Sequence, residues 1–148
     1  ALWATQNHAR RGGWHRTGDV GHIDTAGRLW VEGRMSHLIL SAKGPLTPVA
    51  IEHQAESVNG VRQAAAVGIG PVGTQQLVLV VSTTESAADV VADEQLAGAV
   101  RMAIPHDVAA VLTTSQLPVD RRHNSKIERQ RIAAWAESVL AGARVSRL

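Results

Sequence analysis

Lys126 is the residue whose type and position point most directly to chemistry. It stands in the segment Asn124-Ser125-Lys126-Ile127-Glu128-Arg129, in which Ser125 and Glu128 have the spacing of a capping box. That spacing predicts a helix start with Lys126 in the first turn, beside amides that have no partner within the helix. The helix dipole disfavours a cation there, whereas a bound anion would interact favourably with both the amides and the ammonium group. The segment therefore indicates an anion site, and a solvated lysine on a loop is the alternative.

Two clusters earlier in the chain carry groups that can bind hydroxyls or phosphate. Asp19 follows a glycine turn in Arg16-Thr17-Gly18-Asp19, and a carboxylate there can accept two hydrogen bonds from a vicinal diol such as a ribose. Arg34 follows Gly33 at a chain reversal after an expected strand, where a guanidinium can meet hydroxyls or phosphate. Taken singly, each cluster is also typical of an ordinary turn.

Other kinds of site are not indicated by the residue types. The chain has no cysteine, which excludes disulfides, cysteine zinc sites, iron–sulfur clusters and thiol catalysis. Its seven histidines form no pair with the spacing of a metal motif, so we expect no metal bound by protein side chains.

The segment Gly68-Ile69-Gly70-Pro71-Val72-Gly73 matches the glycine pattern of dinucleotide-binding loops and follows an expected strand. In such loops a helix begins at the last glycine and presents its free amides to the pyrophosphate. Here Thr74-Gln75-Gln76 leads directly into another strand. The glycines therefore favour a loop between two strands over a cofactor site.

Hydrophobic periodicity predicts the elements that must position these residues. Short β-rich runs at 28–32 and 37–41, separated by residues 33–36, indicate a hairpin, and residues 1–21 are expected to be irregular. Thr47 and Pro48 are typical of the N-cap and first residue of a helix. The remaining expected elements are buried strands at 64–69, 77–81 and 109–113, an amphipathic helix over 93–104, a polar loop at 117–124, and a last helix with the apolar stripe Ile132, Trp135, Ala136 and Val139. This order predicts an α+β domain with a small sheet of about five strands and three covering helices.

Composition narrows the class of protein further. With 148 residues, of which 45% are hydrophobic, the chain is long enough for one domain with a sizeable core. The net charge is only +2 and aromatic residues make up 3%, so a nucleic-acid partner is not favoured. The apolar stretches are shorter than the roughly 20 residues of a membrane span, and the first residues lack the apolar core of a secretory signal. We therefore expect a cytoplasmic protein without a membrane span.

Taken together and in order, these clusters resemble the C-terminal part of adenylate-forming enzymes. That superfamily includes acyl-CoA synthetases, luciferases and the adenylation domains of peptide synthetases. The resemblance runs from about Gly13 to Trp135 and is much more specific than any single motif. The segments that carry it are 13–21, 24–27, 29–34, 48–52 and 125–129.

The resemblance implies an enzyme that joins a carboxylate to AMP from ATP, with Mg²⁺, and releases pyrophosphate. It implies that residues 1–33 are the end of a large N-terminal domain whose other residues are absent from this chain. Residues 34–36 would form a hinge, and residues 37–148 a mobile C-terminal domain. The partner of this mobile domain would be the N-terminal domain of the same protein. Asp19 would hold the ribose hydroxyls, Arg34 would assist near the nucleotide, and Lys126 would reach into the interdomain cleft to neutralise charge. Ser36 occupies the hinge position, where the family usually has Asp or Lys, and Ser125 replaces the usual glycine before the lysine.

A closer likeness lies in residues 120–127, Asp-Arg-Arg-His-Asn-Ser-Lys-Ile, which resemble the β-lactone synthetases of bacterial olefin biosynthesis. In those enzymes the hydroxyl of a long-chain β-hydroxy acid displaces AMP to close a four-membered ring, so coenzyme A is not needed. Other enzymes of the olefin pathway are then possible partners. A fatty acyl-CoA ligase, which would use coenzyme A, is the alternative within the superfamily. An alternative from another class is a stand-alone α+β interaction module whose basic cluster around Arg121 binds an acidic partner.

Overall fold

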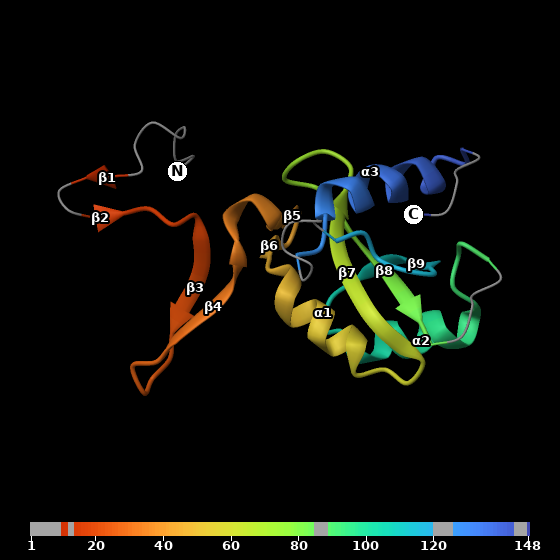
Figure 1. Cartoon of the computed structure of the whole chain (residues 1–148), viewed down its shortest axis with the longest axis horizontal. Coiled ribbons are helices and arrows are strands. Elements are labelled where there is room, and N and C mark those ends of the chain that lie inside the picture. Colours follow the sequence, from red (N-terminus) through yellow and green to blue (C-terminus); the bar gives the residue numbers. More distant parts are fainter. Residues whose placement is uncertain (1–9, 12–13, 85–88, 120–125, 144–147) are drawn as a thin grey trace.

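The computed structural model describes residues 10–11, 14–84, 89–119, 126–143 and 148. Its main body is a three-stranded sheet with helices on both faces (Figure 1). Strand β7 (Val61–Ile69) pairs antiparallel with the central strand β8 (Gln76–Thr83), which pairs in parallel with β9 (Val108–Thr114). Helices α1 (Pro48–Glu56) and α2 (Glu94–Ala103) cover one face, and α3 (Arg129–Leu140) covers the other. The expected α+β class with three helices is confirmed. The expected single sheet of about five strands is not found among the described residues, where the sheet between the helices has three strands and the other strands form separate pairs.

Residue alternation along the strands gives each face of the sheet its own core. The larger core, under α1 and α2, contains Leu77, Leu79 and Val81 from β8. The smaller core, under α3, contains Val78 and Val80 from the same strand. Helix α3 contributes the apolar stripe expected from the sequence, with Ile132 and Ala136 fully buried and Trp135 and Val139 packed at the margin.

The predictions of α1, α2 and the central strands are confirmed because they rest on local signals. Thr47 is the N-cap of α1 and Pro48 is its first residue. At α2, the Asp93 side chain accepts a hydrogen bond from the Leu96 amide at 2.8 Å. None of the described helices is long and apolar enough to cross a membrane.

The glycine-rich segment forms the expected loop between β7 and β8. Gly70 and Gly73 have φ angles of +98° and +92°, which L side chains rarely adopt. At Gly68 an added Cβ would lie only 2.8 Å from the Gln75 side chain, whose Oε1 accepts a hydrogen bond from the Leu40 amide at 2.8 Å. The glycines therefore serve local backbone geometry and close packing.

The expected pairing of 28–32 with 37–41 is wrong. Strand β4 (Leu29–Arg34) pairs with β3 (Asp19–Ile23), and β5 (Ile39–Ser41) pairs with β6 (Gly44–Leu46). A 3-10 helix, Met35–His37, separates β4 from β5 and turns the chain between them. Strand β5 pairs with β6 across residues 42–43, a connection shorter than 33–36 that costs less chain entropy. Strand β4 pairs with β3 across residues 24–28, where Asp24 accepts backbone hydrogen bonds that hold the turn.

Residues 1–21 were expected to be irregular, and this too needs correction. Asp19, Val20 and Gly21 belong to β3, and two further short strands, β1 (Arg10–Arg11) and β2 (Trp14–His15), pair antiparallel. The strands are too short for hydrophobic alternation to reveal them.

The β3–β4 hairpin projects from the body (Figure 1) and is organised around Asp24. The Asp24 carboxylate accepts hydrogen bonds from the Trp30 indole at 2.9 Å and from the Arg28 and Ala26 amides at 2.9 Å each. These hydrogen bonds lower the pKa of Asp24 to about 2, and the bond from Trp30 has the largest effect. The carboxylate that holds the turn is therefore ionised throughout the physiological pH range.

Candidate functional site

Asp19 and Arg34 lie opposite each other in the β3–β4 pairing. Arg34 Nε lies 3.0 Å from Asp19 Oδ1, and Arg34 Nη1 donates a hydrogen bond to the Thr17 carbonyl at 2.7 Å. The Asp19 side chain is 37% exposed and the Arg34 side chain 51% exposed. The two sequence-predicted residues are thus held together by the hairpin while both remain accessible to a ligand.

Lys126 does not lie in the first turn of the last helix, as the capping-box spacing predicted. Helix α3 begins at Arg129, and its N-cap is Glu128, whose side chain makes no capping hydrogen bond. Ile127 forms an isolated antiparallel bridge with Val119, which holds the chain extended before the helix. Ser125, the other half of the expected box, lies outside the described residues.

The Lys126 side chain is exposed, and its neighbour Ile127 packs against the smaller core. Because successive residues of an extended segment point to opposite sides, this packing directs the ammonium group outward. Lys126 forms no ion pair with any other described residue. Lys126 therefore lies outside the helix dipole of α3, and its ammonium group faces outward without an ion-pair partner among the described residues.

A cavity of about 430 Å³ joins the segment around Lys126 to the 3-10 helix. Its lining residues are His37 and Lys126, Ile127, Glu128, Arg129, Gln130 and Arg131. Arg129 is paired with Glu52, and Arg131 Nη1 lies 3.5 Å from Glu128 Oε2. Lys126 is therefore the lining cation whose charge no described carboxylate neutralises.

His37 was not singled out by the sequence patterns, because a single histidine carries no spacing signal. It follows the exposed hinge candidate Ser36 and is half-buried. Burial lowers the pKa of His37 most, and the charges of Arg129, Lys126 and Arg34 lower it further. The same interactions show that two of the predicted site residues, Arg34 and Lys126, lie near this imidazole.

Glu52 and Arg129 fix the start of α3 to the body of the protein. The Glu52 side chain is 7% exposed and the Arg129 side chain 15%. Arg129 donates to both Glu52 oxygens, at 3.0 Å from Nε and 2.5 Å from Nη2, and Glu52 Oε1 also accepts from the Ala66 amide at 3.0 Å. This buried pair connects α1, β7 and the start of α3. Arg129 stands two residues after Ile127, so the pair also fixes the chain close to Lys126.

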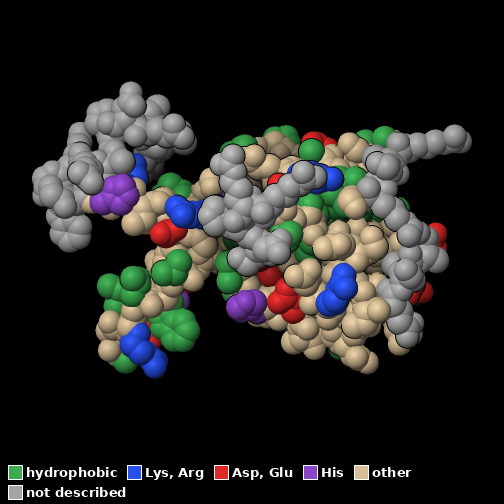
Figure 2. Space-filling model, in the orientation of Figure 1, with side chains coloured by type: hydrophobic (Ala, Val, Ile, Leu, Met, Phe, Trp, Pro, Cys, Tyr) green, Lys and Arg blue, Asp and Glu red, His purple; other side chains and the backbone are tan. Residues whose placement is uncertain are grey.

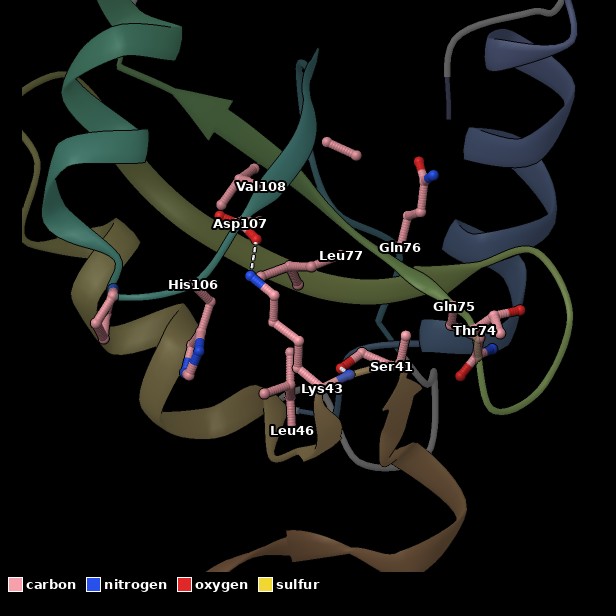
Figure 3. Close-up of a pocket in the computed structure, with 13 residues that line it drawn as sticks. Ser41, Lys43, Leu46, Thr74, Gln75, Gln76, Leu77, His106, Asp107 and Val108 are labelled. Carbon is pink, nitrogen blue, oxygen red and sulfur yellow. Dashed lines mark hydrogen bonds and ion pairs between the residues drawn. The ribbon is translucent and has the colours of Figure 1, made fainter.

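A second cavity, of about 480 Å³, lies between the β5–β6 turn, the end of the β7–β8 loop and the loop before β9 (Figure 3). Lys43 crosses this cavity to pair with Asp107. The hydrogen bond from Lys43 lowers the pKa of the Asp107 carboxyl. Lys43 and Asp107 neutralise each other. Lys43 therefore differs from Lys126, which has no ion-pair partner among the described residues.

The sequence of this chain is similar to those of several ligases and synthetases. No family model matches the sequence. The olefin β-lactone synthetase of Xanthomonas campestris pv. campestris is 44% identical over 126 residues, 82% of this chain and 23% of that protein. The olefin β-lactone synthetase of Stenotrophomonas maltophilia is 38% identical over 128 residues, 85% of this chain and 23% of that protein. A long-chain-fatty-acid–CoA ligase of Mycobacterium tuberculosis matches at 39% identity over 57 residues, 38% of this chain and 11% of that protein.

Among solved structures, ATP-bound MatB from Rhodopseudomonas palustris has the same fold, with a TM-score of 0.71 at 20% identity over 88% of this chain and 26% of that chain. The chain belongs to the adenylate-forming superfamily, as the resemblance of its motifs implied, because its sequence relatives are olefin β-lactone synthetases and CoA ligases. It spans less than a quarter of the length of the two olefin β-lactone synthetases. Within the superfamily, it is a homologue of the olefin β-lactone synthetases.

Proposed function

We propose that this chain is the mobile C-terminal part of an ATP-dependent, AMP-forming ligase that activates a long-chain β-hydroxy acid and closes it to a β-lactone. The observation that carries the proposal is the outward-facing ammonium group of Lys126, which has no ion-pair partner among the described residues. A group that neutralises charge on a ligand held by another domain must face away from its own core. The likeness to the β-lactone synthetases over more than four-fifths of the chain supports the reaction class.

In the first step of the proposed reaction, the substrate carboxylate attacks the α-phosphate of ATP and pyrophosphate leaves. Lys126 offsets the negative charge of the carboxylate and phosphate as they approach each other. Asp19 accepts hydrogen bonds from the ribose hydroxyls, and Arg34, held against it at 3.0 Å, fixes the orientation of the carboxylate. These roles require the three residues to meet one nucleotide from two sides of the hinge.

The described residues do not fit a Mg²⁺ site of their own. The Asp19 carboxylate is already paired with Arg34, and the cavity beside Lys126 is lined by three cationic side chains and one carboxylate. Mg²⁺ prefers carboxylate and phosphate oxygens. The nucleotide and the rest of the enzyme would therefore hold Mg²⁺ in the proposed reaction.

The proposed hinge comprises residues 34–36 and separates 1–33 from the mobile part, 37–148. It coincides with the passage from β4 into the 3-10 helix, and Ser36 is exposed there. On the β3–β4 hairpin, Ile23, Leu29 and Val31 are 70%, 69% and 62% exposed (Figure 2). An apolar patch of this kind is typical of a contact surface, and in our proposal the large N-terminal domain covers it.

The product of the reaction tests the proposal. Full-length protein given ATP, Mg²⁺ and a long-chain 2-alkyl-3-hydroxy acid is expected to form β-lactone, AMP and pyrophosphate without coenzyme A. The matched acid without the 3-hydroxyl should be adenylated but give no lactone. The shorter matches to CoA ligases support one alternative, a fatty acyl-CoA ligase. Thioester formed with coenzyme A, and no lactone without it, would establish that alternative.

Asp19→Ala is expected to raise the KM for ATP. A hydrogen bond to a charged group contributes about 1.5–3 kcal/mol, so losing the ribose contact should raise KM roughly 10- to 100-fold. Steady-state kinetics with ATP varied measures this. Asp107→Ala removes an exposed carboxylate from the other cavity and should leave the KM unchanged. An unchanged KM in Asp19→Ala would remove Asp19 from nucleotide binding.

A further inference from the structure

Among the described residues that line the cavity beside Lys126, His37 is the one whose side chain can change its charge near neutral pH. Its imidazole is half-buried and forms no hydrogen bond with any described residue. It shares the cavity with the Lys126 ammonium group, which the proposed function places against the activated carboxyl group. This imidazole, which has no hydrogen-bond partner among the described residues, therefore lies beside the position assigned to the reacting carbonyl.

The charges around His37 keep the imidazole in its basic form. Arg34 at the end of β4, Lys126 in the extended segment and Arg129 in α3 each carry a positive charge that lowers the pKa of His37. Glu52 is bonded to Arg129, so its negative charge is already engaged. Glu128 also lines the cavity, next to Arg131. With burial and three cations lowering the pKa of His37, the imidazole is neutral at pH 7 and can accept a proton.

We propose that His37 is the general base of lactone closure, a role that rests on the proposed function. The 3-hydroxyl oxygen of the acyl adenylate attacks the carbonyl carbon, while the hydroxyl proton passes to the free imidazole nitrogen. The bond between the carbonyl carbon and the phosphate oxygen breaks, and AMP leaves with its electron pair. The imidazolium then releases its proton to solvent. The negative charge that develops on AMP lies beside Lys126 and offsets the unfavourable charge of an imidazolium among cations.

His37→Gln in the full-length protein tests the proposal, because glutamine can form hydrogen bonds but cannot take up the proton. Single-turnover reactions with ATP, Mg²⁺ and the 2-alkyl-3-hydroxy acid are quenched and assayed for acyl adenylate and β-lactone. Lactone closure should fall roughly 100-fold or more. Acyl adenylate should accumulate, because pyrophosphate exchange, which reports the first step, is affected far less.

The pH profile distinguishes a base from a residue that only shapes the cavity. The rate of lactone closure in the unmodified enzyme should fall as the pH is lowered through the pKa of His37, and the His37→Gln variant should lack that limb. His53→Gln alters an exposed histidine of α1 and should change neither half-reaction.

Two results would overturn the role of His37. One is lactone closure by His37→Gln at the unmodified rate, and the other is an equal loss in both half-reactions with the pH limb retained. Both require that the unmodified enzyme makes lactone. An unmodified enzyme that makes no lactone would instead contradict the proposed function.

Discussion

Replacing Lys126 by alanine in the full-length enzyme is expected to slow ATP–pyrophosphate exchange about 100- to 1,000-fold. A preorganised donor aimed at developing charge contributes about 2.7–4 kcal/mol to the transition state. The Lys126 ammonium group is preorganised because Ile127 anchors its segment in the smaller core and the bridge to Val119 holds the backbone extended. Exchange of labelled pyrophosphate into ATP, measured with saturating β-hydroxy acid, gives the loss directly.

The chain supplies a matched control, since Lys43 is its only other lysine. Lys43 is exposed and pairs with Asp107 in the other cavity, so Lys43→Ala should exchange pyrophosphate at the unmodified rate. Thermal unfolding should be unchanged in Lys126→Ala, because the side chain is exposed and unpaired among the described residues. If Lys126→Ala exchanges pyrophosphate as fast as the unmodified enzyme, the lysine has no part in adenylation.

Among the substitutions considered for this protein, Arg129→Met is expected to lower the free energy of unfolding most. Removing one partner of a buried ion pair typically costs about 3–5 kcal/mol, because the remaining charge stays buried without compensation. Here the Glu52 carboxylate would keep only its hydrogen bond from the Ala66 amide. For a domain of this size the midpoint of thermal unfolding should fall by roughly 10 °C. Calorimetry or circular dichroism on heating measures the change.

Arg131→Met is the control for that experiment. Arg131 lies on the same helix, but its side chain is 62% exposed and its partner Glu128 is 3.5 Å away. Exposed pairs contribute less than about 1 kcal/mol, so unfolding should shift little. Equal shifts in the two variants would mean that the Glu52–Arg129 pair is no more important for stability than a surface pair.

The elements predicted correctly from the sequence are those defined by local patterns. Ile132 and Ala136 lie one turn apart on one face of α3, and Thr47 and Pro48 mark the start of α1 within two residues. The pairing of β4 with β3 could not be read in this way. Their side chains show no burial alternation, because the hairpin stands away from the core and most of its residues are exposed.

The site shows the same division between local and long-range information. Asp19, Arg34 and Lys126 could be chosen from residue type and order, and the first two are indeed in contact. The start of α3 was misplaced because the bridge from Val119 to Ile127 is a tertiary contact. The Glu52–Arg129 pair joins residues 77 positions apart, and no spacing rule relates them.

The alternation along β8 has a consequence for evolution and engineering. Val78 and Val80 support α3 and the segment that carries Lys126, whereas Leu77, Leu79 and Val81 belong to the opposite interior. Volume changes on the α3 side therefore act on the packing beneath the Lys126 segment and not on the core under α1 and α2. In the proposed enzyme, substitutions hidden beneath α3 are expected to alter adenylation although they lie far from any atom that meets a ligand.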